Sequence, residues 1–359
     1  MYKTTSKTWL LLLLVLLLMA GCNKQSTGTV HDLILSHREC NSVYYWKTSY
    51  RLIQEEIDFL QRYQVGRMYI RFFDVVMDTN PMTLEWDAIP NATIQFLDRP
   101  DSTLEIVPTV YITLEALKLM KDAEEEYAGK IVERVMAMVK ANKLNNVKEI
   151  QLDCDWTGST EYSYFRLCRE VWEQLHSQSV AVSATIRLHQ LRQNEPPVDR
   201  VVLMLYNTGN IRSAKTENSI LSYDDVLPYL NKKITYGLHL DYAYPTFYWG
   251  VWFHDGQFRA ILDRKTLTEM ERSEQIRKKD GRYYEVVESG FGKGDDHPYY
   301  QEGDRIRIEK PSFREIMRVK NLVERRLETK SRSNILYHLD LSNLSNYSGH
   351  EIETMFCTD

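Results

Sequence analysis

Two aspartates at the end of a short apolar run are the residues of this chain best suited to chemistry. Asp153 and Asp155 lie in the segment Leu-Asp-Cys-Asp-Trp-Thr, residues 152–157. If this run is a buried strand, alternate residues share a face, so both carboxylates point the same way. Two acids beside a core carry a desolvation cost, which suggests a function that retains them. Thr157 takes the place where a third acid would continue the same face.

Eight apolar segments alternate with helical patterns, so we predict an α/β chain folded as a (β/α)8 TIM barrel, with an open doubly wound sheet as the alternative. Most of the segments are rich in Val, Ile, Leu and Tyr, as is typical of parallel strands covered on both faces. The strands are expected at 42–47, 67–74, 105–112, 149–155, 181–187, 200–206, 233–241 and 334–341. Helices are expected at 50–64, 124–140, 159–177 and 312–330. Ser312 and Glu315 predict a capping box at the start of the last helix.

The barrel is expected to span residues 31–359, with a small α+β insertion at 245–310 between the seventh and eighth strands. Residues 248–258 alternate aromatic side chains around an Asp-Gly pair, which predicts a β-hairpin. Segments 281–287 and 304–308 are two further expected strands. A long ordered connection at the rim of a barrel is more often functional than not.

In a barrel of this kind, reactive side chains project from the carboxyl ends of the strands. The side chains expected there are acids, aromatic rings and amides. This set suits a carbohydrate, because rings stack on sugars while carboxylates and amides bond to hydroxyl groups. The candidates for chemistry are Asp153, Asp155, Tyr206 and Asp241, and the candidate ligand contacts are Trp46, Trp156, Arg187, Asn207 and Tyr242.

Two of the predicted strands resemble those of the family 18 glycoside hydrolases, the chitinase group. The fourth is similar to the family motif DxxDxDxE: Asp153 and Asp155 match, Ile150 stands for the first acid and Thr157 for the last. The sixth ends in Met-Leu-Tyr-Asn, residues 204–207, and is similar to the family's Met-x-Tyr-Asp or Met-x-Tyr-Asn. The resemblance also extends to the insertion, which many members of the family carry after the seventh strand.

The resemblance implies an N-acetylated glycan as the ligand, cleaved with the help of its own acetamido group. In that mechanism the acetamido oxygen attacks the anomeric carbon, the middle acid and a tyrosine orient it, and the last glutamic acid protonates the leaving oxygen. Asp155 and Tyr206 match the orienting roles, with Asp153 behind Asp155. Thr157 is no general acid, because its hydroxyl does not release a proton in the useful range. Either another carboxyl supplies the proton, or the barrel is non-catalytic and serves to bind a glycan or as a structural lipoprotein.

Several carboxyls are candidates to replace the missing acid. Asp241, at the expected end of the seventh strand, is the better one. Glu161 starts a helix, where a carboxylate also serves the helix dipole. Asp74 and Asp340 end neighbouring strands, and pairing with an arginine is an equally suitable use for them.

The first 21 residues are expected to be a lipoprotein signal peptide. A basic start precedes the apolar run 9–20, which is short for a membrane span. Ala-Gly before Cys22 resembles the bacterial lipobox and implies cleavage and acylation at Cys22. Residues 22–30 then form a lipidated tether. The folded chain is expected in the cell envelope, by default at the outer membrane, and an uncleaved anchor is the alternative.

Net charge and cysteine and histidine spacing limit the classes of molecule that the chain is expected to bind. The net charge is -5, and loss of the two lysines of the signal peptide makes it -7. This mild acidity argues against nucleic acid. We expect an oligosaccharide or polysaccharide and the membrane as partners, no cofactor and no metal, because no Cys-x-x-Cys pair or histidine spacing indicates a site. The sequence indicates no oligomeric state. Cys154 and Cys168 are expected as buried free thiols, whereas barrel closure would bring Cys40 near Cys357.

Overall fold

The computed structural model describes residues 40–290, 299–329 and 332–358. The signal peptide, the acylation site at Cys22 and the tether that the sequence predicts lie outside these residues. Within them, no helix has the length and apolar character needed to cross a membrane. Cys40, Cys154, Cys168 and Cys357 are all free thiols, so no disulfide joins Cys40 to Cys357.

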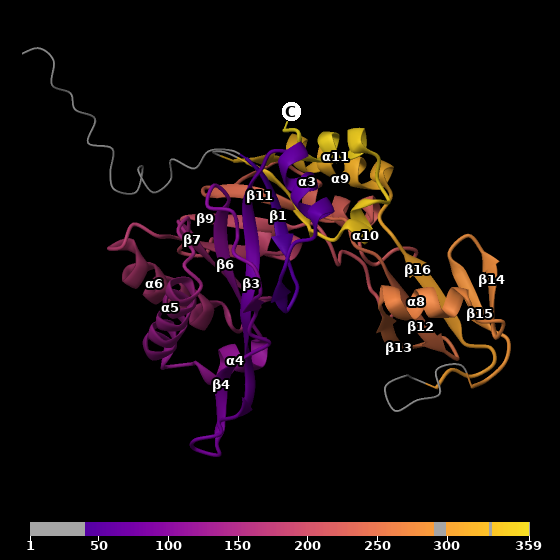
Figure 1. Cartoon of the computed structure of the whole chain (residues 1–359), viewed down its shortest axis with the longest axis horizontal. Coiled ribbons are helices and arrows are strands. Elements are labelled where there is room, and N and C mark those ends of the chain that lie inside the picture. The colour runs from indigo at the N-terminus through magenta and orange to yellow at the C-terminus, as the bar shows by residue number, and fades with distance from the viewer. Residues whose placement is uncertain (1–39, 291–298, 330–331, 359) are drawn as a thin grey trace, which may run out of the picture. The chain divides into compact units, whose positions relative to one another are not determined.

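Eight parallel strands close into a barrel (Figure 1), which confirms the predicted fold. The ring runs in the order β1, β18, β11, β9, β8, β7, β6 and β3, and the pairing of β1 with β3 closes it. The strands are β1 Asn41–Tyr45, β3 Val65–Thr79, β6 Glu105–Ile112, β7 Glu149–Asp153, β8 Ala181–Ile186, β9 Arg200–Met204, β11 His239–Pro245 and β18 Asn334–Tyr337. Closure excludes the open sheet.

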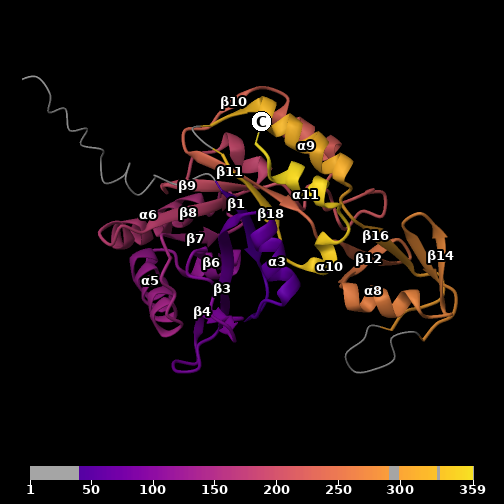
Figure 2. The same cartoon turned by 45° about the horizontal axis from the view of Figure 1, so that its top comes forward.

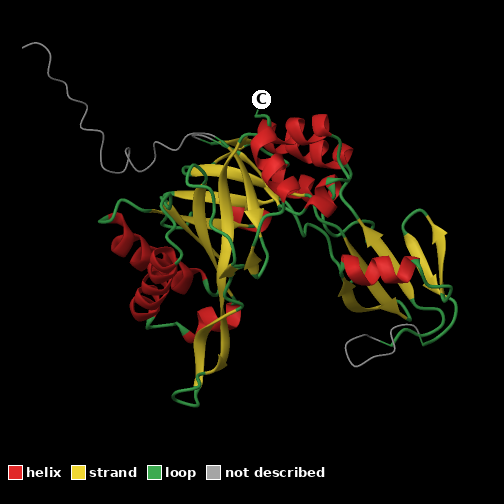
Figure 3. Cartoon of the chain, viewed as in Figure 1, coloured by secondary structure: helices red, strands yellow, loops and turns green. Residues whose placement is uncertain are grey.

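Helices fill the connections between the parallel strands (Figure 3), as such crossovers require. They are α3 Gln54–Arg62, α4 Leu114–Leu119, α5 Glu124–Ala141, α6 Glu161–His176, α7 Tyr223–Val226 and α9 Phe313–Arg326. Two more helices, α10 Leu341–Leu344 and α11 Gly349–Phe356, follow the last barrel strand. Ser312 caps α9 by accepting the N–H of Glu315. The Glu315 carboxylate instead accepts the N–H of Tyr223 at 2.6 Å, so half of the predicted capping box forms.

Strands between Trp249 and Glu309 form a second, antiparallel sheet (Figure 2) in the order β13, β12, β16, β15, β14. Its elements are β12 Trp249–His254, β13 Gln257–Leu262, α8 Arg264–Glu271, β14 Ile276–Asp280, β15 Tyr283–Val286 and β16 Arg305–Glu309. Asp255 and Gly256 turn the predicted hairpin with φ of 49° and 74°. This sheet has a small core of its own, which includes Leu267 and Ile306.

Strand β3 is longer than the predicted 67–74 and continues past the barrel rim. Its last six residues pair antiparallel with β4, Trp86–Asn91, and form a hairpin at the edge of the sheet. Short pieces complete the fold: β2 Ser49–Tyr50, β5 Gln95–Phe96, β10 Ile234–Thr235, β17 Leu327–Glu328 and the 3-10 helices η1 Leu188–Arg192 and η2 Leu227–Leu230.

The predicted bounds of the seventh strand, 233–241, are wrong. The strand is β11, His239–Pro245, so Asp241 lies near its start and not at its carboxyl end. Asp241 is buried: Oδ2 lies 3.2 Å from Nη1 of Arg200, and Oδ1 accepts the N–H of Ser333 at 2.7 Å. The structure therefore places Asp241 in the amino-terminal layer of the barrel, away from the strand ends where a general acid was expected.

Candidate functional site

Inward-facing residues of β7 lead up to the candidate site. Glu149, Gln151 and Asp153 alternate along the strand and are all buried. Glu149 lies with Arg200 in the amino-terminal layer, 3.9 Å apart. Above it, Gln151 accepts a hydrogen bond from the hydroxyl of Tyr44 at 2.7 Å. Asp153 follows on the same face at the carboxyl end of the barrel, as the sequence pattern predicts.

Asp153 is buried and is held in place by Thr185, its neighbour on β8. The hydroxyl of Thr185 donates to Oδ1 of Asp153 at 2.6 Å. Burial raises the pKa of Asp153 from 3.8 to about 6, and the charge of Arg187 and the bond from Thr185 oppose this rise. Asp153 therefore binds a proton far more readily than an ordinary aspartate.

Asp155 forms an ion pair with the residue that follows β8. Nε of Arg187 lies 2.6 Å from Oδ1 of Asp155, whose side chain is 46% exposed. The guanidinium also lies over the ring of Tyr206, with 5.2 Å between Cζ and the ring centroid. Arg187 thus links the motif aspartate of β7 to the tyrosine that follows β9.

Tyr206 is packed into an aromatic cluster at the mouth of the barrel. Its ring stacks on Tyr337 with centroids 4.6 Å apart, and its hydroxyl contacts the sulfur of Met204. Burial raises the pKa of Tyr206 well above 10, so the hydroxyl stays protonated and donates to the Met204 sulfur. Trp46 lies 5.7 Å from Tyr337 between ring centroids and extends the cluster.

A cavity of about 320 Å³ opens beside these groups, which is the size of a small ligand pocket. Asp155, Arg187, Tyr206 and Asn207 all line it, so the structure brings four of the residues predicted for the site to one pocket. The other lining residues are Leu188, His189, Met204, Thr208 and Tyr229. Asp153 lies behind Asp155 and does not line the cavity.

Two predicted ligand contacts lie in the core. Trp156 is fully buried and packs against Tyr164 and Phe165. Tyr242 is also fully buried, because it follows Asp241 on β11 and takes the opposite face of that strand. The structure therefore places Trp156 and Tyr242 away from the cavity, in contrast to the expectation for a ligand contact.

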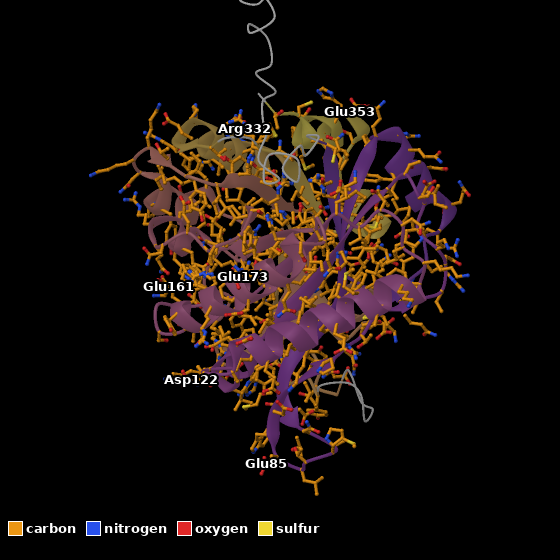
Figure 4. All side chains as sticks on the ribbon, turned by 90° about the vertical axis from the view of Figure 1, so that its left-hand side faces the viewer. Glu85, Asp122, Glu161, Glu173, Arg332 and Glu353 are labelled. Atoms are coloured by element: carbon orange, nitrogen blue, oxygen red, sulfur yellow. The ribbon has the colours of Figure 1, made fainter. Side chains whose placement is uncertain are left out.

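The other acids proposed as substitutes already have partners. Asp74 forms an ion pair with Arg71 through both of its oxygens. Asp340 caps α10 and accepts bonds from Ser342. Glu161 accepts a hydrogen bond from Asn194 at 2.7 Å and lies at the outer surface of α6 (Figure 4). None of these three acids lines the cavity that contains Asp155.

Sequence reasoning missed Tyr337 and Tyr229 as site residues, and it placed Met204 in a motif without assigning it to the site. The eighth strand was expected to run to residue 341, which drew attention to Asp340 at its end. The strand ends at Tyr337, and the inward alternation of Ile335 and Tyr337 is the signal that points to this ring. Tyr229 comes from η2, a short helix with no strand-end position to mark it.

A closed parallel barrel with acids and aromatic rings at its carboxyl end defines a protein of the (β/α)8 barrel class. Among solved structures, the group IV chitinase of Ostrinia furnacalis covers 89% of this chain and 98% of its own, with 11% identity and a TM-score of 0.50. The Bacillus cereus spore cortex-lytic enzyme SleL covers 89% of this chain and 75% of its own, with 13% identity and a TM-score of 0.49. The chain is therefore a divergent barrel with the fold of the family 18 chitinases.

Comparison of sequences adds nothing to this assignment. No protein-family model matches the chain, and no curated protein matches it. At 11% identity, the likeness to the chitinase establishes the fold alone.

Ionisation of Asp153 should destabilise the fold as pH rises. Its pKa is about 6 in the folded protein and near 3.8 in the unfolded chain. The loss of folding stability is therefore absent when the pH is below the unfolded pKa and complete when it is above the folded pKa. The difference corresponds to about 3 kcal/mol. Asp153→Asn keeps an acceptor for Thr185 and should raise the free energy of unfolding at neutral pH. Near pH 4, urea unfolding of the two proteins should agree. A difference that does not change with pH would contradict this assignment.

Proposed function

We propose that this chain is a lipid-anchored protein of the bacterial cell envelope whose barrel binds an N-acetylated glycan without hydrolysing it. The chitinase fold supports a glycan ligand, and the cavity supplies the polar groups and aromatic rings that sugars need. The acetamido group is the part of the ligand expected nearest Asp155 and Tyr206, on the basis of the family resemblance of their two segments.

The pairing of Asp155 with Arg187 carries the proposal that hydrolysis is lost. In a substrate-assisted mechanism the middle acid orients the acetamido group and the last acid protonates the leaving oxygen. Here Nε of Arg187 donates a hydrogen bond to Oδ1 of Asp155 at 2.6 Å, so this oxygen already has a partner. At the position of the last acid, the hydroxyl of Thr157 bonds to that of Ser159 at 2.9 Å. An ion pair and a hydroxyl still bind sugar groups, but they supply no proton.

Hydrolysis is the second candidate, and the raised pKa of Asp153 favours it. A carboxyl with a pKa of about 6 holds a proton for part of the time near neutral pH. Its hydrogen bond from Thr185 and its burial behind Asp155 argue against its reaching a leaving oxygen. Binding therefore remains the better supported function.

A glycan panel that measures binding and product release separately tests the proposal. Binding of an N-acetylated oligosaccharide without products is expected. Asp155→Asn and Tyr206→Phe should each weaken binding by about tenfold, the loss of one good hydrogen bond at roughly 1.4 kcal/mol, with little change in Tm. The exposed Asp98→Asn is the matched control and should bind as the wild type does. Released sugar would assign hydrolysis, and no binding to any N-acetylated glycan would refute the proposal.

The envelope location has a separate test, because it depends on residues 1–22 alone. Cells that express the chain should incorporate labelled palmitate into it and retain it in the membrane fraction. Cys22→Ser should abolish both the palmitate labelling and the retention in the membrane fraction. Labelling that survives this substitution would contradict acylation at Cys22.

A further inference from the structure

A buried carboxylate lies where the second sheet joins the barrel. Glu309 is the last residue of β16, and its partner across the sheet is Trp249, the first residue of the neighbouring strand β12 (Figure 2). The side chain of Glu309 is fully buried, and it does not line the cavity that contains Asp155. A buried charge persists only where its partners offset the cost of removing it from water.

One oxygen of Glu309 pairs with an arginine that reaches the barrel. Nε of Arg307 donates to Oε1 of Glu309 at 2.8 Å, and the side chain of Arg307 is also fully buried. Nη1 of Arg307 donates to the carbonyl oxygen of Ser213 at 2.9 Å. Ser213 belongs to residues 205–222, which connect β9 to α7. The pair therefore joins the second sheet to this connection of the barrel.

The other oxygen of Glu309 binds the same connection and an aromatic side chain. Oε2 accepts hydrogen bonds from the hydroxyl of the buried Ser219 and, at 2.7 Å, from Nε1 of Trp249. The ring of Phe247 lies 5.2 Å from that of Trp249 and 6.0 Å from that of Tyr206, between centroids. Glu309 thus links the connection to the aromatic cluster that contains Tyr206.

Hydrogen bonds across the connection tie Ser219 to the wall of the cavity. The N–H of Gly209 donates to the carbonyl oxygen of Ser219 at 3.1 Å, and the N–H of Ser222 donates to the hydroxyl of Thr208 at 3.1 Å. Thr208 lines the cavity that contains Asp155. A Cβ at Gly209 would lie only 3.1 Å from the Cα of Ser219, so the two arms of the connection are closely packed. A displacement of Ser219 should therefore displace Thr208.

We propose that Glu309 is a positioning residue for the ligand cavity. Its bond to Ser219 fixes the part of the wall that Asn207 and Thr208 form, so the affinity of the cavity depends on a carboxylate of the second sheet. A wall that is held in place before the ligand arrives lowers the entropy cost of binding. The nature of the ligand rests on the proposed function, whereas the effect of Glu309 on the wall exists without a ligand.

Ser219→Ala in the mature chain tests this proposal, because it removes the bond from the connection and retains the pair of Arg307 with Glu309. The amide of Gly209 should exchange its hydrogen about fivefold faster, as expected for the loss of one hydrogen bond. Affinity for an N-acetylated oligosaccharide should fall by about threefold to fivefold. Thr216→Val is the matched control and should change neither value, because the hydroxyl of Thr216 bonds within the connection, to the carbonyl oxygen of Asn210.

A second matched pair separates positioning from the stability of the second sheet. Asp304 is another buried carboxylate of this sheet that accepts an indole N–H, from Trp252 at 2.8 Å. Asp304→Asn should lower Tm but leave glycan affinity and exchange at Gly209 unchanged. Glu309→Gln should affect both at least as strongly as Ser219→Ala does.

Three results would overturn the proposal. They are unchanged exchange at Gly209 in Ser219→Ala, faster exchange with unchanged affinity for a glycan that the parent binds, and equal losses of affinity in Glu309→Gln and Asp304→Asn. If the parent binds no N-acetylated glycan, the proposed function fails by itself. Exchange at Gly209 then still decides whether Glu309 positions the wall, since faster exchange in Ser219→Ala but not in Thr216→Val would support it.

Discussion

Asp241→Ala is expected to lower the free energy of unfolding by about 3 kcal/mol. The substitution removes a buried carboxylate that pairs with Arg200 and accepts the N–H of Ser333, and it leaves the guanidinium of Arg200 short of a partner. Glu149 lies 3.9 Å from the same guanidinium and compensates in part. Chemical unfolding at neutral pH measures the effect.

One further variant separates the charge of Asp241 from its hydrogen bond, and a surface variant serves as the control. Asp241→Asn retains an acceptor for Ser333 and should cost less than the alanine variant. Asp98→Ala removes a half-exposed partner of Arg51 and should change stability by less than about 1 kcal/mol. If Asp241→Ala abolished glycan binding while stability stayed unchanged, Asp241 would belong to the ligand site after all.

Trp156→Ala is expected to destabilise the protein by about 3–5 kcal/mol. The indole is fully buried between α6 and the barrel, with its ring centroid 5.1 Å from that of Phe165 and 6.2 Å from that of Tyr164. Removing it leaves a cavity that the neighbouring rings only partly fill. Trp156→Phe keeps most of the volume and should cost less.

The role of Trp156 in the core also predicts what this substitution leaves unchanged. At a temperature where the variant is still folded, its affinity for a glycan should equal that of the parent. The exposed Tyr162→Ala controls for loss of an aromatic side chain at the surface. Weakened binding with an unchanged free energy of unfolding would show that the ring contacts the ligand.

The barrel was predictable because buried parallel strands are continuous apolar runs. The third barrel strand was expected at 105–112 and is β6, Glu105–Ile112. The exceptions have physical reasons. Residues 233–238 are apolar enough to suggest a strand, yet the barrel strand begins only at His239, after Gly237. The continuation of β3 beyond Asp74 was missed because its far end is exposed and lacks the apolar run of a barrel strand.

The candidate site was predictable within a strand but not between strands. A period of two places Asp153 and Asp155 on one face from sequence alone. The ion pair of Asp155 with Arg187 depends instead on the register of β7 against β8. Leu152 pairs with Ala184, which brings Asp153 level with Thr185 and Asp155 level with Arg187. No local pattern encodes this alignment, so the sequence did not predict that Asp155 pairs with Arg187.

The ring of strands also has a consequence for how the chain matures. Ser42 on β1 pairs with Ile335 on β18, so the first barrel strand stays without one neighbour until nearly the whole polypeptide is available. Contacts between residues so far apart in sequence slow folding and leave strand edges open in the meantime. The same delay makes the loss of residues 334–358 more harmful than a truncation of equal length in a surface loop.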